Sequence, residues 1–127
     1  MNYKSKLERD FAKALKENKI KAEYEADKFP YVRPSSYTPD WKLKEKLYLE
    51  TKGEFTAAQR ANLLAFREQY PDIQIIMVFA CATNKLHKKA KMTYAEWCDK
   101  NGIKYHDLQA VYENGQYRFK NPIPKYK

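Results

Sequence analysis

Apolar residues recur along this chain at two spacings, that of amphipathic helices and that of strands. Helices are expected over residues 5–16, 57–69 and 93–102. The inward-facing residues expected for the first two helices are Leu7, Phe11, Ala14 and Leu15, and then Ala61, Leu64 and Ala65. Thr56 is the expected start of the second helix, and Thr93 with Glu96 forms a capping box that begins the third.

Strand patterns fill the intervals between these helices. Residues 22–32 alternate charged with small or aromatic residues, residues 73–81 are apolar on both faces, and residues 103–106 return to the sheet. An Asn-Gly pair between two alternating segments predicts a hairpin over residues 111–119. Alternating helices and strands, without repeats or a glycine-rich phosphate loop, predict a single α/β domain over residues 1–127.

A further hairpin is expected over residues 37–52. Its apolar residues bracket the polar run 44–46, which we interpret as a three-residue loop. In that register position 43 faces 47, position 41 faces 49, and Asp40 faces Glu50 with about 4.5–5.5 Å between their Cβ atoms. Lys52 lies on the same face of the strand as Glu50. Two carboxylates and an amine are therefore expected to meet at the open end of the hairpin.

This constellation suits phosphodiester hydrolysis. Mg²⁺ is a hard cation that prefers oxygen ligands and is commonly held by one or two carboxylates together with substrate phosphate oxygens. Asp40 and Glu50 are candidate ligands, and Lys52 is a candidate for orienting the attacking water and stabilising the charge that develops on the phosphoryl group. A surface hairpin with solvated charges is the alternative, because an acidic residue two positions before a lysine occurs three times here, about as often as composition predicts.

Glu8 allows two interpretations from its position alone. Ser5 and Glu8 have the spacing of a capping box, in which the carboxylate accepts a hydrogen bond from the Ser5 backbone N–H and needs no further function. A carboxylate in the first turn of a helix is also kept ionised by the helix dipole, as a metal ligand has to be.

The charge of the chain indicates a polyanionic partner. The sequence has 25 Lys and Arg against 16 Asp and Glu, which gives a net charge of +9. Lysines mark a basic tail over residues 120–127, and four others follow the apolar run closely. The candidate DNA contacts are Arg60, Arg67, Lys85, His87, Lys88, Lys89 and Lys91. Such clusters are also common on solvated surfaces, and the neighbouring candidate site favours the DNA interpretation.

Several classes of protein are not expected. No apolar run approaches the roughly 18 residues that span a bilayer, and the first residues do not begin a secretory leader, so we expect a cytoplasmic protein without a membrane partner. Cys81 and Cys98 are expected to be buried free thiols. A zinc site is not expected, because the sequence has no CxxC pair and His87 and His106 are isolated.

Six motifs occur in an order that resembles the phage endonuclease I family, a group of Holliday-junction resolvases in the PD-(D/E)xK nuclease superfamily. They are Ser5-x-Leu7-Glu8, Phe29-Pro30-Tyr31-Val32-x-Pro34, Tyr37-Thr38-Pro39-Asp40, Glu50-Thr51-Lys52-Gly53, Arg67-Glu68-Gln69-x-Pro71 and Tyr94-x-Glu96-x-Cys98-x-Lys100-x-Gly102-Ile103-Lys104. The resemblance runs from about residue 5 to about residue 107.

The resemblance implies a metal-dependent, structure-selective endonuclease that cuts four-way and other branched DNA. It implies a restriction-endonuclease-like α/β fold, in which helices flank a mixed central sheet. The implied active-site residues are Glu8, Asp40, Glu50 and Lys52, and the implied metal ligands are Glu8, Asp40, Glu50 and the backbone carbonyl of Thr51. We expect two Mg²⁺ ions per site, with Mn²⁺ as a substitute and no nucleotide cofactor.

The resemblance also implies an intertwined homodimer. The N-terminal helix and first strand of one chain would complete the active site of the other. Residues 33–37 are the expected connector, and the run from Pro34 to Tyr37 is shorter than the bridging segment of the family. Pro34 and the extended character of residues 29–37 disfavour a sharp reversal, which favours exchange.

Two other functions stay open at this point. In an architectural DNA-binding module, Asp40, Glu50 and Lys52 would form a structural ion cluster on a nuclease scaffold. A restriction-like or transposon-end nuclease would use the same residues on linear duplex DNA. Metal-dependent cleavage separates the first from an enzyme, and comparison of a four-way junction with its duplex arms separates the second.

Overall fold

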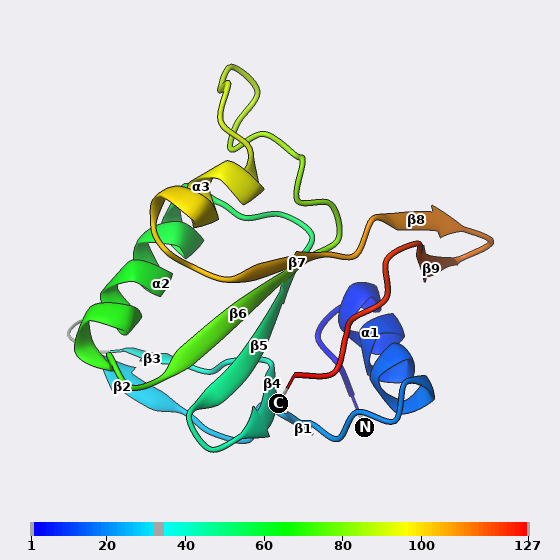
Figure 1. Cartoon of the computed structure of the whole chain (residues 1–127), viewed down its shortest axis with the longest axis horizontal. Helices are drawn as coiled ribbons and strands as arrows, with labels where there is room; N and C mark the ends of the chain where they lie inside the picture. Colours follow the sequence, from blue (N-terminus) through cyan, green and yellow to red (C-terminus); the bar gives the residue numbers. More distant parts are fainter. Residues whose placement is uncertain (1, 32–34, 127) are drawn as a thin grey trace.

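A mixed five-stranded sheet forms the middle layer of the molecule (Figure 1). In spatial order its strands are β1 (Glu23–Tyr24), β4 (Trp41–Lys44), β5 (Leu47–Lys52), β6 (Gln74–Phe79) and β7 (Tyr105–Asp107). Antiparallel pairing joins β1, β4 and β5, whereas β5, β6 and β7 run parallel. The computed structural model describes residues 2–31 and 35–126 of the chain. The α/β class and the mixed sheet expected from the sequence are confirmed.

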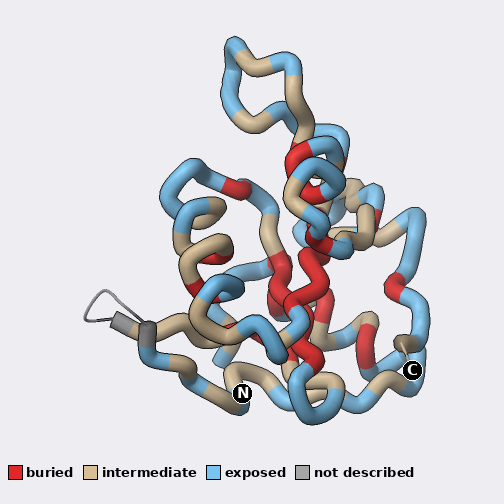
Figure 2. Tube along the Cα trace, turned by 60° about the vertical axis from the view of Figure 1, so that its left-hand side comes forward, coloured by how far each residue is buried: buried red, intermediate tan, exposed pale blue. Residues whose placement is uncertain are grey.

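Helices cover both faces of this sheet (Figure 1). α2 (Ala57–Gln69) and α3 (Tyr94–Lys100) pack on one face, and α1 (Lys6–Glu17) packs on the other. Because side chains alternate along a strand, Tyr48 of β5 joins the core beneath α2 and α3, whereas Leu49 joins the core beneath α1. The buried strands in the middle of Figure 2 are thus shared by two apolar layers.

The hairpin formed by β4 and β5 differs from the expected one at its turn. Position 41 faces 49 as predicted, but position 44 rather than 43 faces 47. A bulge on β4 takes up the extra residue, and a two-residue turn in which Lys46 is left-handed (φ 68°) replaces the expected three-residue loop. The error is confined to the turn, so the register that brings Asp40 beside Glu50 is preserved.

The expected helix starts are confirmed. Thr56 with Gln59, at the start of α2, and Thr93 with Glu96, at the start of α3, form complete capping boxes with hydrogen bonds in both directions. Gly102 follows α3 with φ 65°, in agreement with its expected role at the end of that helix.

The expected inward face of α2 is correct in part, since Leu64 packs against the core, but it is wrong for Ala61 and omits the residues buried most deeply. Ala61 is exposed, and the buried residues of this helix are Leu63 and Phe66. The ring of Phe66 packs against Phe29, with ring centroids 5.3 Å apart, and stacks on Tyr37 at 4.6 Å. Burial of this large aromatic ring outweighs the burial of alanine and sets the rotation of the helix about its axis.

The single strand expected over residues 22–32 is replaced by two short strands. Glu25 adopts a left-handed backbone conformation (φ 45°), and β1 ends just before it. β2 (Phe29–Tyr31) pairs antiparallel with β3 (Ser35–Tyr37), so the chain reverses here instead of running extended as we expected. Of the expected connector, residues 35–37 form β3, and residues 33 and 34 lie outside the described residues.

Residues 83–92, between β6 and α3, project from the body of the molecule at the top of Figures 1 and 2. We call this segment the basic loop. Its two arms approach each other at an isolated bridge between Lys85 and Thr93. The chain leaves the sheet beside β5, because the Ala80 N–H donates a hydrogen bond to the Lys52 carbonyl oxygen (3.0 Å). The basic loop therefore starts close to the candidate active site.

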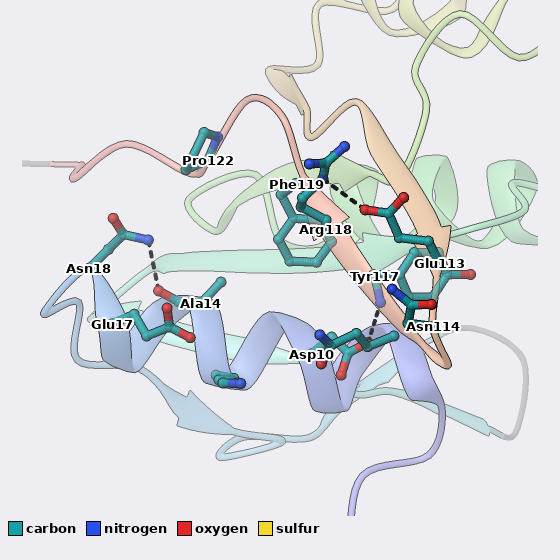
Figure 3. Close-up of a pocket in the computed structure, with 12 residues that line it drawn as sticks. Asp10, Ala14, Glu17, Asn18, Glu113, Asn114, Tyr117, Arg118, Phe119 and Pro122 are labelled. Carbon is teal, nitrogen blue, oxygen red and sulfur yellow. Dashed lines mark hydrogen bonds and ion pairs between the residues drawn. The ribbon is translucent and has the colours of Figure 1, made fainter.

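A second hairpin, made of β8 (Ala110–Glu113) and β9 (Gln116–Phe119), packs on α1 (Figure 3). Both residues of the Asn114-Gly115 turn are left-handed (φ 53° and 78°), as the sequence predicts. The Tyr117 N–H donates to Asp10 Oδ2 of α1 over 2.8 Å. A groove of about 340 Å³ is lined by residues of both the hairpin and the helix. None of the candidate active-site residues lines it.

The expected basic tail folds back onto the α1 side of the sheet. Ile123 is buried in the core there, and Tyr126 packs against it. The Asn121 N–H donates to the Leu108 carbonyl oxygen (3.0 Å). Lys127 lies outside the described residues.

The cysteines are free thiols, as expected, but only Cys98 is buried, since Cys81 is half-buried. Across residues 2–31 and 35–126, every helix is too short or too polar to cross a lipid bilayer.

Candidate active site

Asp40 and Glu50 lie together at the open end of the β4–β5 hairpin. Glu50 belongs to β5, and Asp40 immediately precedes β4. The Asp40 backbone N–H donates a hydrogen bond to Glu50 Oε1 over 3.2 Å. Asp40 is 7% exposed and Glu50 is 5% exposed. The hairpin therefore places in one buried position the two carboxylates that the spacing predicted.

Thr51 directs the Asp40 carboxylate. Asp40 Oδ2 accepts hydrogen bonds from the Thr51 backbone N–H (2.8 Å) and from Thr51 Oγ1 (2.7 Å). The expected side-by-side arrangement of the two carboxylates therefore needs a correction. The backbone of Asp40 contacts Glu50, while its side chain turns to Thr51, because Asp40 lies just outside the regular strand pairing.

Burial raises the pKa of both carboxyl groups. Loss of solvation is the largest cause for Asp40 and the nearby Glu50 charge adds to it, so the pKa of Asp40 rises to about 8 against the hydrogen bonds from Thr51. Burial also raises the pKa of Glu50, and the Lys52 charge opposes that rise. Two carboxylates this close and this buried are stable as a charged pair only beside positive charge.

Lys52 supplies part of that positive charge. Its Nζ lies 3.2 Å from Glu50 Oε2, and 22% of its side chain is exposed. The amine therefore links the buried carboxylate to the surface, where a phosphate group of a substrate can reach it. Lys52 thus stands where the sequence predicted, on the same side of β5 as Glu50.

Glu8 approaches the site from the first turn of α1. Ser5 is the N-cap of this helix, and its Oγ accepts a hydrogen bond from the Glu8 N–H (3.1 Å). The second half of the expected capping box is replaced, because Glu8 Oε1 accepts from the Lys4 backbone N–H (2.9 Å) and from the Tyr24 hydroxyl (2.6 Å). The Glu8 charge contributes to the raised pKa of both Asp40 and Glu50, so it acts on the same site.

The donor set fits a hard divalent cation held mainly by Asp40 and Glu50. All the candidate ligand atoms are oxygens, which suits Mg²⁺ or Mn²⁺ better than zinc. A cation would relieve the repulsion that raises the pKa of both carboxyl groups. Within the described parts of the chain, no three His, Cys, Asp or Glu side chains gather closely enough to hold one ion. Most positions around an ion held by Asp40 and Glu50 would therefore be left to water and phosphate oxygens.

Three contributions to the site were missed by the sequence reasoning. The Thr51 hydroxyl binds Asp40, the Tyr24 hydroxyl binds Glu8, and the Glu25 N–H donates to the Asp40 carbonyl oxygen (2.7 Å). Burial and the hydrogen bond to Glu8 raise the pKa of the Tyr24 hydroxyl, which keeps it a donor. No local sequence signal identifies these contacts, because each joins residues 11 to 16 positions apart or depends on the left-handed turn at Glu25.

The predicted DNA contacts differ in whether their charges are already engaged. The guanidinium group of Arg60 donates to the Phe55 carbonyl oxygen (2.6 Å), and that of Arg67 donates to the Asn101 carbonyl oxygen. Arg67 also lies in the last turn of α2, which leads to the amino end of β6 and so away from Asp40. A role in binding DNA stays a prediction for both arginines.

The basic side chains of the basic loop are free in comparison. Its predicted DNA contacts are all exposed: Lys85, His87, Lys88, Lys89 and Lys91. None of these lysines forms an ion pair with a residue that the structure describes. Their charge is available to a polyanion next to the carboxyl end of β5.

This chain is similar to known phage nucleases. The family model described as Phage endonuclease I matches residues 1–120, which extends the resemblance beyond residue 107 to the β8–β9 hairpin. Endonuclease I of Escherichia phage T7 is 42% identical over 108 residues, which cover 83% of this chain and 72% of that protein. Endodeoxyribonuclease 1 of Enterobacteria phage T3 is 40% identical over 108 residues, which cover 83% of this chain and 71% of that protein.

Proposed function

The chain belongs to the phage endonuclease I family, and from this membership we propose that it is a metal-dependent nuclease that resolves four-way and other branched DNA. It is a DNA endonuclease, as its relatives are named. The proposal of metal-dependent cleavage rests on the buried pair of Asp40 and Glu50, with Lys52 at its rim and an exposed lysine-rich loop beside it.

Asp40 and Glu50 are the proposed metal ligands, together with the Thr51 backbone carbonyl and, from α1, Glu8. We propose Mg²⁺ as the natural ion, with two ions per site and Mn²⁺ as a substitute. When bound, the ions would polarise a phosphoryl oxygen and lower the pKa of the attacking water. The Thr51 donors hold the Asp40 carboxylate in place before any ion arrives.

Lys52 has a different part in the proposed reaction. Its amine is held by Glu50 Oε2 and is partly exposed, so it can donate hydrogen bonds to a phosphoryl oxygen and to the attacking water. Negative charge grows on the phosphoryl oxygens as water attacks the phosphorus and the bond to the leaving oxygen lengthens. A fixed ammonium group at the rim stabilises that charge more than it stabilises the bound substrate, which is the requirement for raising the rate.

The basic loop is the proposed DNA contact. Exposed lysines bind phosphates without regard to base sequence, so they place the DNA backbone near Lys52 and leave selectivity to the shape of the substrate. The loop projects from the body of the molecule on the side where β5 and β6 end, which suits a substrate with more than one duplex arm (Figure 1).

The proposed assembly is a homodimer with exchanged N-terminal segments. The N-terminal segment, residues 2–31, contacts residues 35–126 in three places. These are the β1–β4 pair, the β2–β3 pair and the packing of α1 on the sheet. If β2 of one chain paired with β3 of another, every one of these contacts would be kept. Exchange therefore needs a change only between β2 and β3.

Mixed dimers test the exchange. A Glu8→Ala chain and an Asp40→Asn chain are unfolded together and refolded. If sites are shared, each mixed dimer has one doubly altered site and one intact site, and nicking of a junction returns without paired cleavage. An unexchanged dimer would have one defect in each site and restore nothing, and a monomer in sedimentation at assay concentration would refute the assembly.

Cleavage of a four-way junction and of its separate duplex arms, at equal salt, tests the substrate. We expect cutting of the junction with Mg²⁺ or Mn²⁺, none with EDTA, and much slower cutting of the arms. Equal rates on junction and arms would identify a nuclease of linear duplex DNA. Junction binding without cleavage at any metal concentration would identify a DNA-binding module.

A further inference from the structure

Two hydrogen bonds fix the Glu8 carboxylate at the same oxygen atom. The Tyr24 hydroxyl donates to Oε1 over 2.6 Å, and the Lys4 backbone N–H donates to Oε1 over 2.9 Å. No hydrogen bond to Oε2 is made by residues 2–31 or 35–126. One oxygen of Glu8 is thus tied to the protein and the other is not, while the Glu8 charge acts on Asp40 and Glu50.

The short strand β1, to which Tyr24 belongs, also holds Asp40. Tyr24 pairs with Trp41, the residue after Asp40, and the next N–H along the chain, that of Glu25, donates to the Asp40 carbonyl oxygen over 2.7 Å. Glu25 has the left-handed φ of 45°, an uncommon conformation for a residue other than glycine, at the point where β1 stops. Tyr24 and Glu25 therefore connect the Glu8 carboxylate with the backbone of Asp40, just before β4.

The ring of Tyr24 is held by its neighbours, so its hydroxyl has a fixed direction. Tyr3 packs edge-on against it with ring centroids 4.6 Å apart, and Trp41 packs at 5.1 Å. A hydroxyl that is fixed in this way can orient a carboxylate, as outer hydrogen-bond partners do for the ligands of metal sites.

We propose that Tyr24 is a positioning residue for Glu8, which it holds by Oε1 so that Oε2 is presented to the site that Asp40 and Glu50 form. The inference rests on the proposed function, since it assigns Glu8 a part in that site. It holds whether or not the N-terminal segments are exchanged, because Lys4, Glu8 and Tyr24 all belong to the segment before β3.

Removal of one hydroxyl group tests the proposal. Tyr24→Phe deletes the donor and keeps the ring, and Tyr3→Phe is the matched control, because it deletes a hydroxyl from the same aromatic cluster without touching Glu8. We expect Tyr24→Phe to slow single-turnover junction cleavage by about 10- to 100-fold and to weaken Mn²⁺ binding to the metal-free protein, measured calorimetrically, by about 10-fold. Junction affinity should change less than about twofold in both variants, and Tyr3→Phe should keep the wild-type rate.

A double-mutant cycle distinguishes a loss of the hydrogen bond to Glu8 from a change in packing. In a Glu8→Ala background, Tyr24→Phe should have no further effect on rate or Mn²⁺ binding, because its partner is gone. Equal losses in Tyr24→Phe and Tyr3→Phe, or an undiminished effect of Tyr24→Phe without Glu8, would assign the effect to packing and overturn the proposal. Wild-type rate and Mn²⁺ binding in Tyr24→Phe would also overturn it. A wild-type protein that neither binds Mn²⁺ nor cuts DNA would instead overturn the proposed function itself.

Discussion

The carboxyl end of β5 and the basic loop lie next to each other and carry opposite charges in opposite environments. Asp40 and Glu50 are buried, mutually repelling and held by hydrogen bonds, whereas the loop lysines are exposed and unpaired among the described residues. Attraction of DNA is a long-range effect that needs only exposed charge, while catalysis needs charge that is fixed and sheltered from water. The difference predicts that substitutions in one region change the rate and that those in the other change affinity.

Lys52 lies where the two regions meet. Its amine contacts Glu50, and its carbonyl oxygen accepts the hydrogen bond from the Ala80 N–H, just before the basic loop leaves the sheet. Lys52 is thus the residue whose substitution separates the two effects least cleanly.

Neutralising either buried carboxylate gives the largest expected effect. Asp40→Asn and Glu50→Gln keep shape and hydrogen-bond acceptors but lose the charge that would hold a metal ion. We expect cleavage to fall at least about 10³-fold, since a bound ion contributes several kcal/mol to the transition state. Junction affinity, measured by gel shift in Ca²⁺ or EDTA, should stay within about threefold. Unchanged cleavage by either variant would refute the site assignment.

Lys52→Ala should have the next largest effect. We expect the single-turnover rate to fall by about 10²–10⁴-fold, as is typical when a group that acts in the transition state is lost, with a smaller loss of junction affinity. Lys44→Ala is the matched control, because Lys44 is exposed at the other end of the same hairpin and carries the same charge. A loss confined to affinity would reassign Lys52 to DNA binding.

Changing Lys88, Lys89 and Lys91 together to Ala should affect affinity and spare the chemical step. If all three contact phosphates, the slope of log affinity against log salt should flatten by about 2.7 units, at about 0.9 for each phosphate on duplex DNA. The control with the same change of charge is Lys16, Lys21 and Lys44 to Ala, all exposed and outside the basic loop. An unaltered slope would show that the loop lysines are only solvated.

The smallest expected effect is a dependence of stability on pH. The pKa of Asp40 is about 8 in the folded protein and near its ordinary value of 3.8 in the unfolded chain, so the folded state binds the proton more tightly. This contribution is complete below the ordinary pKa, declines as the pH rises and is lost above about 8. Asp40→Asn does not titrate, so its gain in melting temperature over wild type, measured in EDTA, should grow between pH 5 and 8 and then level off. A constant difference across that range would contradict the raised pKa.

Features that depend on neighbouring residues could be read from the sequence. The capping boxes at Thr56 and Thr93, the Asn114-Gly115 turn and the pairing of positions 41 and 49 were all predicted correctly. The placing of Asp40, Glu50 and Lys52 at one end of the hairpin belongs to this class, whereas the turn of the Asp40 side chain to Thr51 does not. An error of one residue at the turn was absorbed by a bulge and did not reach the site.

Features that depend on packing across the chain were decided only by the tertiary structure. Phe66, rather than the alanines of α2, faces the core because the aromatic rings of Phe29 and Tyr37 are there to receive it. The reversal between β2 and β3, the engagement of Arg67 by the Asn101 carbonyl and the hydrogen bond from Tyr24 to Glu8 have the same origin. The sequence determined which groups could act, because periodicity and turn chemistry operate over a few residues. Tertiary structure decided which of them are held, buried or free, because that depends on partners brought together by the folding of the whole chain.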